Sequence, residues 1–276
     1  MATASAKSLV RFEHVTVTFD GVPALDDVSF EVAEGETRII LGAASSGKTV
    51  LLKTALGLVR PDSGSVYLFG QDITRMTERE LFDIRSKVGM LFQESALFDS
   101  LTIKENVAYP LLNQKAIQCA PEDVDRRVKD ALRFVELDQT LARFPSELSG
   151  GMRRRAAIAR AVVTEPPLVL YDSPTAGLDP ITAYTIMALI IKERDLANTT
   201  TLIVTHRFQD GLLTANFRYN PDSGQLVPAH ENGHRPQLRT KFIVMHEGKI
   251  VFVGTQDELE AVTDPYISKF RRQGGG

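Results

Sequence analysis

The stretch GAASSGKT, Gly42 to Thr49, carries the most specific chemistry in this sequence. It fits the pattern G-x-x-x-x-G-K-[ST], in which successive backbone N–H groups of a loop point at phosphate oxygens. A helix that begins at the end of such a loop adds a positive dipole. In this pattern the lysine, here Lys48, reaches the β and γ phosphates, and the threonine hydroxyl can ligate Mg²⁺. The stretch therefore predicts a phosphate-binding loop with one magnesium ligand.

A single carboxylate ends the apolar run LVLYD, Leu168 to Asp172. A buried carboxylate is costly unless a cation or hydrogen bonds compensate its charge. In P-loop NTPases a second strand beside the phosphate loop ends in an aspartate that holds Mg²⁺. We therefore predict that Asp172 and Thr49 hold the metal together. The next residue is Ser173, whose hydroxyl is essentially never ionised near pH 7.

The segment LSGGM, Leu148 to Met152, precedes a cationic stretch with helical spacing. A serine followed by two glycines is compatible with an ordinary helix N-cap. The segment also lies between the phosphate loop and the strand that ends at Asp172.

Strands and helices alternate around these motifs. Residues 9–33 alternate apolar and polar side chains in short pieces, which predicts antiparallel strands joined by turns. Buried strands lead into Gly42 and Asp172, and helical spacing follows. This pattern implies a mainly parallel α/β sheet with a helical insertion at residues 95–160. Residues 211–240 are polar and without a clear period, so we expect an extended hairpin or a partly mobile insertion.

The phosphate loop, LSGGM and the aspartate strand, in this order, resemble the ATP-binding cassette (ABC) family over nearly the whole chain. The resemblance implies a P-loop NTPase (RecA-like) α/β core with an N-terminal antiparallel β subdomain and an inserted α-helical subdomain. Residues 1–276 would then form one nucleotide-binding domain. The resemblance also implies ATP and Mg²⁺ as cofactors. It further implies a head-to-tail homodimer with ATP in both seams, whose hydrolysis drives transmembrane permease subunits.

The resemblance assigns roles to individual residues. Phe19 takes the place of the aromatic that stacks on adenine, and a phenylalanine of the strand core is the alternative. Gln93 matches the glutamine that senses Mg²⁺ and the transmembrane partner, and His206 matches the switch histidine near the γ-phosphate. Residues 149–151 match the signature that contacts ATP bound to the other subunit. Residues 176–179 match the loop that crosses between the two sites.

The expected site divides into three groups. The predicted nucleotide-binding residues are Phe19, Gly42, Ala43, Ala44, Ser45, Ser46, Gly47, Lys48, Thr49, Val50, Ser149, Gly150, Gly151 and Asp179. The predicted metal ligands are Thr49, Gln93 and Asp172. The predicted catalytic residues are His206, Gln93, Asp172 and Ser173.

Ser173 departs from the family pattern, which has a glutamate that polarises the attacking water. Loss of a positioned base typically costs about 10²–10⁴ in rate. Glu165 lies at the start of the same strand, the wrong end for a site at strand carboxyl ends. Asp179 belongs to the crossing loop, so the sequence offers no evident replacement. Ser45 is a second departure, because ABC phosphate loops usually carry glycine there.

Two further segments narrow the resemblance. Phe92–Leu111 and Asp264–Phe270 look like segments of the ATPases of Mla/Mce lipid transporters. We therefore expect a subunit that couples ATP binding and hydrolysis to phospholipid transport by membrane subunits, in a system that includes a lipid-carrier substrate-binding protein. The alternative is a turnover-impaired nucleotide-binding regulatory module. An ABC protein that acts on ribosomes or DNA usually needs tandem cassettes, a coiled coil or a strongly basic surface, which we do not find in the sequence.

Composition limits the remaining classes. Lys and Arg total 32 against 35 Asp and Glu, which argues against a nucleic-acid partner. No apolar run approaches the ~18 residues of a membrane span, and the N-terminus does not resemble a secretory signal. The single Cys119 fits a reducing cytoplasm. The expected location is therefore the cytoplasmic face of the inner membrane, where permease subunits would hold the chain peripherally.

Overall fold

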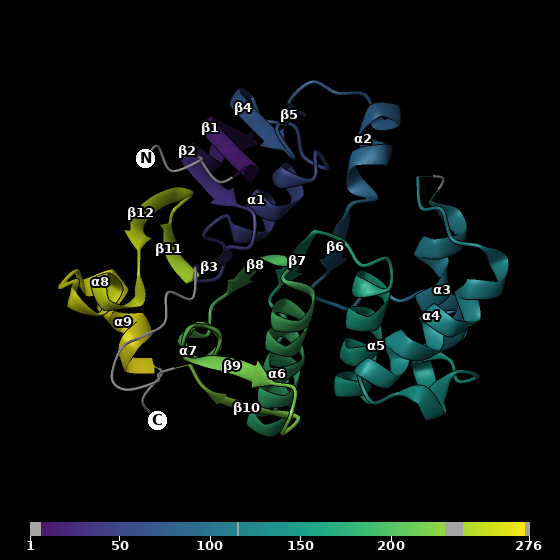
Figure 1. The fold of residues 1–276 in the computed structure, drawn as a ribbon. Helices are drawn as coiled ribbons and strands as arrows, with labels where there is room; N and C mark the ends of the chain where they lie inside the picture. The colour runs from purple at the N-terminus through teal and green to yellow at the C-terminus, as the bar shows by residue number, and fades with distance from the viewer. Residues whose placement is uncertain (1–6, 115, 230–239, 274–276) are drawn as a thin grey trace, which may run out of the picture.

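The computed structural model describes residues 7–114, 116–229 and 240–273. An antiparallel sheet is formed mainly by the N-terminal part of the chain, as the alternation in residues 9–33 predicts (Figure 1). Its strands follow the order β2-β1-β4-β5. They are β1 (Ser8–Phe19), β2 (Val22–Ala33), β4 (Ser63–Leu68) and β5 (Gln71–Asp72).

The core sheet has the strand order β12-β11-β3-β8-β7-β6. Its strands are β3 (Thr37–Gly42), β6 (Val88–Leu91), β7 (Leu168–Asp172), β8 (Thr200–Thr205), β11 (Thr240–His246) and β12 (Lys249–Gly254). All neighbouring pairs are parallel except β11 and β12, so the mainly parallel α/β core is confirmed. Parallel strands end at the same edge, which places Gly42, Asp172 and His206 together.

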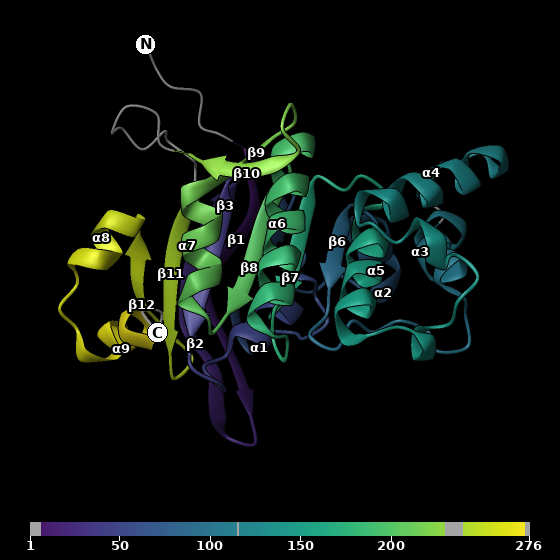
Figure 2. The same ribbon diagram turned by 90° about the horizontal axis from the view of Figure 1, so that it is seen from below.

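Helices cover both faces of the core sheet (Figures 1 and 2). The helical insertion contains α3 (Ile103–Asn113), α4 (Pro121–Phe134), η1 (Asp138–Thr140), η2 (Pro145–Glu147) and α5 (Gly150–Val162). The remaining helices are α1 (Lys48–Ala55), α2 (Glu78–Arg85), α6 (Pro180–Ala197), α7 (Phe208–Asn216), α8 (Gln256–Ala261) and α9 (Pro265–Gln273). Helices α8 and α9 lie at the sheet edge formed by β11 and β12 (Figure 2).

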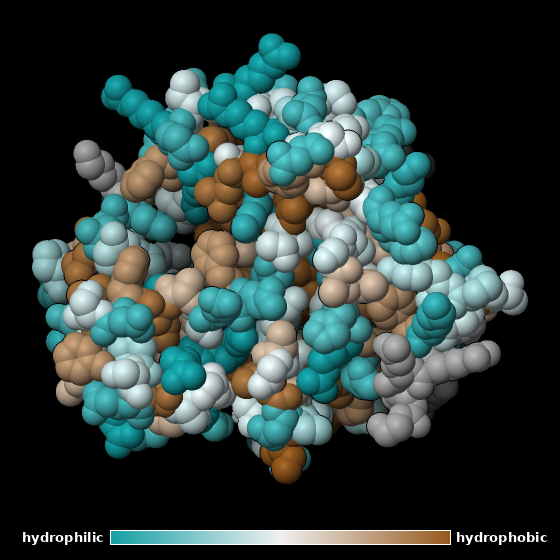
Figure 3. All heavy atoms as spheres, turned by 180° about the vertical axis from the view of Figure 1, so that it is seen from behind, coloured by the Kyte–Doolittle hydropathy of each residue, from teal (hydrophilic) through white to brown (hydrophobic). Residues whose placement is uncertain are grey.

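Two hydrophobic cores sandwich the parallel sheet, and each buried strand contributes to both. In β7, Val169 and Tyr171 pack with α5 and α6, whereas Leu168 and Leu170 pack with α1 and the N-terminal sheet. Successive side chains of a strand point to opposite faces. Asp172 therefore continues the Leu168 side and faces α1, the helix that follows the phosphate loop. On the face seen from behind, hydrophobic side chains form separate patches between polar ones (Figure 3).

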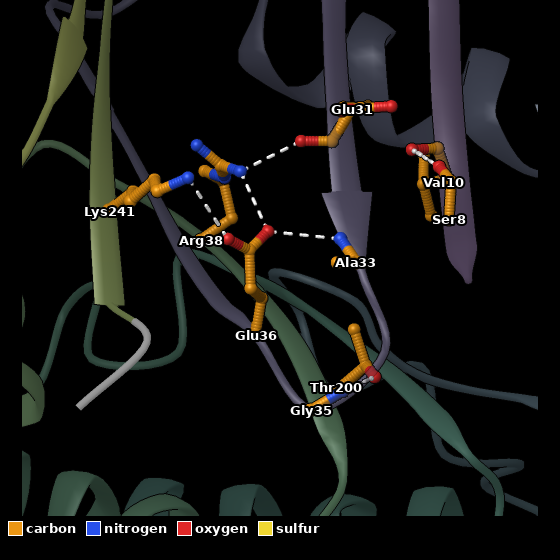
Figure 4. A network of polar contacts seen from close by, with 9 residues as sticks. All are labelled: Ser8, Val10, Glu31, Ala33, Gly35, Glu36, Arg38, Thr200 and Lys241. Carbon is orange, nitrogen blue, oxygen red and sulfur yellow. Dashed lines mark hydrogen bonds and ion pairs between the residues drawn. The ribbon is translucent and has the colours of Figure 1, made fainter. Parts of the chain in front are cut away.

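A buried polar network holds the start of β3, at the end of the strand away from the phosphate loop (Figure 4). Arg38 donates to the Glu36 carboxylate at 2.9 Å and to the Glu31 carbonyl at 2.7 Å. The Ala33 N–H donates to Glu36 at 2.9 Å, and the Lys241 ammonium lies 3.2 Å from the same carboxylate. The network therefore ties β3 to β2 on one side and to β11 on the other.

The stretch 211–240 contains a hairpin, as expected, but the hairpin is short and a helix that was not predicted precedes it. Helix α7 covers its first residues, and a hairpin of β9 (Phe217–Asn220) and β10 (Gln225–Pro228) follows. Residues 230–239 lie outside the described part of the chain. The sequence pattern did not indicate α7 because its buried face carries Asp210, Gly211 and Thr214 beside a single phenylalanine. Such a face has no hydrophobic period.

Helix α2 was also not predicted. It buries only Leu81 and Ile84, too few for a periodic pattern. Its N-terminus nevertheless carries a capping box, in which the Thr77 hydroxyl and the Glu80 carboxylate each accept from the other's backbone N–H. The T-x-x-E spacing is the sequence signal that identifies such a helix start.

Candidate nucleotide-binding site

A pocket of about 590 Å³ lies over the phosphate loop and the ends of β7 and β8. It brings together eight of the predicted site residues: Ala43, Ala44, Ser45, Lys48, Thr49, Gln93, Ser173 and His206. Three residues of α9 that the sequence analysis did not assign also line it: Tyr266, Lys269 and Phe270. Among the described residues, no carboxylate lines the pocket, although Asp172 lies directly behind Thr49.

The phosphate loop turns sharply between β3 and α1. Gly47 has φ 97°, and a Cβ there would lie 2.3 Å from the Ala24 carbonyl oxygen, so the turn requires glycine. Ser45 also has a left-handed backbone, with φ 61°. This conformation explains why glycine is the usual residue at its position in ABC loops.

The Lys48 ammonium is held against the loop that precedes it. It donates to the Gly42 carbonyl at 3.0 Å, the Ala43 carbonyl at 2.6 Å and the Ser46 hydroxyl at 3.1 Å. Burial lowers the pKa of Lys48 to about 8, although the nearby Asp172 carboxylate acts in the opposite direction. A buried cation at the start of a helix is a favourable partner for phosphate oxygens.

Thr49 and Asp172, two of the predicted metal ligands, lie within hydrogen-bond distance of each other. The Thr49 hydroxyl and the Ser173 hydroxyl each donate to Asp172 Oδ1 at 3.3 Å. Burial raises the pKa of Asp172, while these two hydrogen bonds and the charge of Lys48 act against the rise. A buried carboxylate beside a hydroxyl fits Mg²⁺, which usually takes one or two protein oxygens together with phosphates and water. No group of three or more His, Cys, Asp or Glu residues suited to a metal occurs in the described ranges.

The loop after Asp172 is held against the end of β8. Ser173 has φ 48°, and its N–H donates to the Val204 carbonyl at 2.9 Å. Asp210 of α7, which the sequence analysis did not select, accepts hydrogen bonds from Thr175 at 2.6 Å and from Thr205 at 2.8 Å. Asp210 thus joins the loop that carries Ser173 to the residue that precedes His206.

The other predicted nucleotide contacts do not line this pocket. Phe19 ends β1 with 49% of its surface exposed, and Val50 lies in the first turn of α1. Ser149 caps α5 by accepting from the Met152 N–H at 3.3 Å, and Asp179 caps α6. Ser149 therefore has the structural role that the N-cap interpretation anticipates, whereas the capping role of Asp179 was not predicted.

The two glycines of the LSGGM segment differ in their surroundings. A Cβ on Gly151 would lie 2.6 Å from a methyl carbon of Thr182, so the packing of α5 on α6 requires glycine there. A Cβ on Gly150 would meet nothing closer than 4.0 Å. Packing within the chain therefore does not account for Gly150.

A sequence model described as ABC transporter matches residues 25–176. This match covers more than half of the chain and includes the phosphate loop, LSGGM and Asp172. The chain belongs to the ABC transporter family. It is an ABC-type ATPase cassette, the ATP-binding subunit of such a transporter.

Several relatives and solved structures resemble this cassette. The intermembrane phospholipid transport system ATP-binding protein MlaF of Haemophilus influenzae is 36% identical over 77% of the chain and 80% of its own length. The methionine import ATP-binding protein MetN of Carboxydothermus hydrogenoformans is 38% identical over 73% of the chain and 60% of its own length. The dimeric ATP-binding cassette MJ0796 with ADP and Pi has a TM-score of 0.75 at 28% identity, and the match covers 89% of this chain and 98% of that one.

Arg154 is a further buried cation of the cassette that the sequence analysis did not select. It is 6% exposed and donates to the Phe92 carbonyl at 3.1 Å, directly before Gln93. Nothing in the run of three arginines at the start of α5 distinguishes this residue from its neighbours. Glu165, considered as a replacement base, lines a different pocket between α4, α5 and α6.

Proposed function

We propose that this cassette drives phospholipid transport by membrane subunits of the Mla/Mce type. The observation that carries the ATP-dependent part is the convergence of Lys48, Thr49, Gln93 and His206 on one pocket. The lipid class is supported by the similarity to MlaF, which extends over 80% of that protein. The segment at residues 92–111, which resembles a segment of Mla/Mce lipid-transporter ATPases, supports the same class of substrate.

In this proposal Thr49, Asp172 and Gln93 hold Mg²⁺, which would neutralise charge on the β and γ phosphates of ATP. The phosphate loop, residues 42–50, holds the phosphates through its N–H groups and Lys48. Phe19 would contact the adenine, and His206 would contact the γ-phosphate. These roles follow the family pattern, and the hydrogen bond between Thr49 and Asp172 supports the pairing of these two metal ligands.

A head-to-tail homodimer would complete each ATP site. The dimeric MJ0796 cassette supports this arrangement by similarity. The open space at Gly150 also supports it, because a partner's nucleotide could approach the backbone there. The partner's residues 149–151 and 176–179 would then close over the ATP that this chain holds.

The segment after Gln93 is the proposed contact with a permease. Phe98 and Tyr109 are 41% and 40% exposed, and their ring centroids lie 4.7 Å apart. Leu112 adds a side chain that is 65% exposed. Exposed aromatic and aliphatic groups of this kind commonly form interface cores. The part of the chain that the structure describes contains no helix long and apolar enough to cross a membrane. The permease, with its lipid-carrier protein, would hold the cassette at the cytoplasmic face of the inner membrane.

Ser173 favours a second candidate function, a cassette that closes on ATP and turns over too slowly for transport. Its hydroxyl lies beside Asp172, and the described pocket wall holds no carboxylate to replace the missing base. Such a cassette would act as a regulatory module. Both functions predict ATP binding, but only the first requires steady turnover.

Steady-state Mg-ATP hydrolysis separates the two functions. The transport function predicts that the native chain hydrolyses ATP above the Lys48→Ala blank, whereas the regulatory function predicts a rate at the blank that Ser173→Glu raises by about 10²–10⁴. Hydrolysis by the native chain far above the blank would mean that another group supplies the base.

The lipid class needs a separate experiment. The tagged chain is purified from its own membranes, and co-purifying proteins and extracted lipids are identified by mass spectrometry. Enriched phospholipid that is lost in Phe98→Asp, but retained in the control Phe82→Asp on α2, supports lipid transport. A co-purifying methionine-binding protein with no enriched lipid contradicts it.

A further inference from the structure

Helix α9 forms one wall of the nucleotide pocket. Tyr266, Lys269 and Phe270 line the same pocket as Lys48 and Thr49. Their spacing of three and four residues places them on one face of the helix. The end of the described chain therefore turns one helical face toward the site where the proposed function places phosphate.

The Tyr266 hydroxyl fixes this helix to the phosphate loop. It accepts a hydrogen bond from the Ala43 N–H at 3.0 Å and donates to the Met245 carbonyl at 2.9 Å. Its ring stacks on His246 with centroids 3.8 Å apart and meets the edge of Phe270 at 5.2 Å. One side chain therefore links α9, the end of β11 and the second residue of the phosphate loop.

Lys269 places a second cation at the pocket. The Lys48 ammonium already has three oxygen partners within the loop. Lys269 makes no hydrogen bond or ion pair with the residues that the structure describes, and no carboxylate lines its pocket there. A lysine ammonium is a compact charge on a flexible stem, which suits phosphate binding.

We propose that Lys269 is a phosphate-binding residue supplied by α9, and that Tyr266 is the positioning residue that holds α9 against the loop. The inference rests on the proposed ATP site and adds to it a contact from the end of the chain. The ligand chemistry is that of a nucleoside polyphosphate with bound magnesium.

Isothermal titration calorimetry with Mg-ATP tests the cation. We expect Lys269→Ala to raise the Kd about fivefold, as for a partly exposed charge contact, and Lys269→Glu to raise it further. The affinity of the native chain should also fall more steeply with added KCl than that of Lys269→Ala. Lys129→Ala, an exposed lysine on α4, is the matched control and should bind like the native chain.

Tyr266→Phe tests the positioning role because it keeps both ring contacts and removes the hydroxyl. We expect weaker Mg-ATP binding, with Tyr184→Phe on α6 as the exposed control. Hydrogen exchange adds a readout that a purely structural role would not change. In the native chain Mg-ATP should slow exchange of the α9 amides, and in Tyr266→Phe this protection should be lost.

The outcomes separate this inference from the proposed function. If the native chain itself fails to bind Mg-ATP, the proposed function is wrong. If the native chain binds and Lys48→Ala does not, but both Lys269 variants bind within about twofold of the native chain, Lys269 is not a phosphate ligand. If Mg-ATP does not change the exchange rate of the α9 amides in the native chain, the proposed role of Tyr266 is wrong.

Discussion

At the scale of single residues, the end of β7 combines a well-placed carboxylate with a missing base. Asp172 is 2% exposed, and burial raises its pKa even though two hydroxyl groups donate to it. A carboxylate in this position is unfavourable to the fold by itself. The proposed Mg²⁺ would offset that cost, so metal binding and stability are opposed at this residue.

Asp172→Asn should therefore stabilise the protein without ligand and impair its response to Mg-ATP. We expect the Tm without ligand to rise by about 2–4 °C, the effect of ~1 kcal/mol in a chain of this size. The Tm increase that Mg-ATP produces in the native chain should shrink. Asp222→Asn, an exposed aspartate in the β9–β10 turn, is the control. An unchanged response of Asp172→Asn to Mg-ATP would contradict the proposed metal site.

Glu193 provides a pH-dependent prediction away from the nucleotide pocket. Burial raises its pKa from 4.5 to about 7, although the Thr199 hydroxyl donates to it at 2.6 Å. A raised folded-state pKa favours the protonated form in the native state. The stability it contributes is complete below pH 4.5 and is lost as pH rises through about 7.

Urea unfolding of Glu193→Gln at about pH 5 and about pH 8 tests this sign. The native chain should lose roughly 2–3 kcal/mol more than the variant, because this interval covers most of the pKa difference between 4.5 and about 7. Parallel loss of stability in both proteins would mean that Glu193 does not titrate in this range.

At the scale of elements, the start of β3 depends on a buried ion pair. Arg38 and Glu36 are 3% and 8% exposed, whereas the Lys241 side chain is 48% exposed (Figure 4). Burial acts to raise the pKa of Glu36, but the Ala33 N–H and the charges of Arg38 and Lys241 outweigh it, so the pKa is lowered. The network therefore stabilises β3 above the ordinary pKa of a glutamate and weakens as pH falls.

Arg38→Ala should destabilise the fold by about 3–5 kcal/mol because it leaves the Glu36 charge buried with one cation fewer. Lys241→Ala removes a half-exposed partner of the same carboxylate and should cost below ~1 kcal/mol. Urea unfolding near neutral pH measures both. Equal losses in the two variants would show that burial does not decide the strength of this network.

At the scale of the whole molecule, the proposed homodimer would connect the LSGGM segment to an ATP site. Within the chain this segment contributes Leu148 to the core, caps α5 and packs on α6, and it does not line the pocket that holds Lys48. Because the segment lies outside that pocket, it could reach an ATP only in a second copy of the chain. Ser173 should prolong such a dimer, because slow hydrolysis leaves ATP in the seams.

Gly150→Asp should therefore abolish dimerisation in Mg-ATP without unfolding the chain. Gly150 has open space around it and is the first residue of α5, where a carboxylate is favourable to the helix dipole. The new charge would oppose the γ-phosphate of the partner's ATP. Light scattering after size exclusion should show a dimer for the native chain and a monomer for this variant. Gln139→Glu, which adds the same charge on an exposed turn, should still dimerise, and a dimeric Gly150→Asp would contradict the proposed seam.

The amino-acid sequence was sufficient to predict the phosphate loop, the strand that ends at Asp172 and the α/β class. These features depend on short-range chemistry, because a phosphate loop needs a fixed spacing of glycine, lysine and threonine, and a buried strand needs a run of apolar residues. The sequence also shows directly that a serine, Ser173, follows Asp172 in place of the glutamate of the family pattern. The hydrophobic periodicity of the sequence did not predict α2 and α7, because their buried faces are short or polar.

The residues that come from distant parts of the chain to the nucleotide pocket could be identified only in the folded structure. Tyr266 contacts Ala43 although 223 positions separate them, and Asp210 joins Thr175 to Thr205 across two strand ends. The local sequence does not indicate these contacts, because Tyr266 and Asp210 are ordinary polar side chains on helices, and the resemblance of residues 264–270 assigned no contact to Tyr266. Their role arises from the strand order, which places the ends of β11, β3, β8 and β7 along one edge.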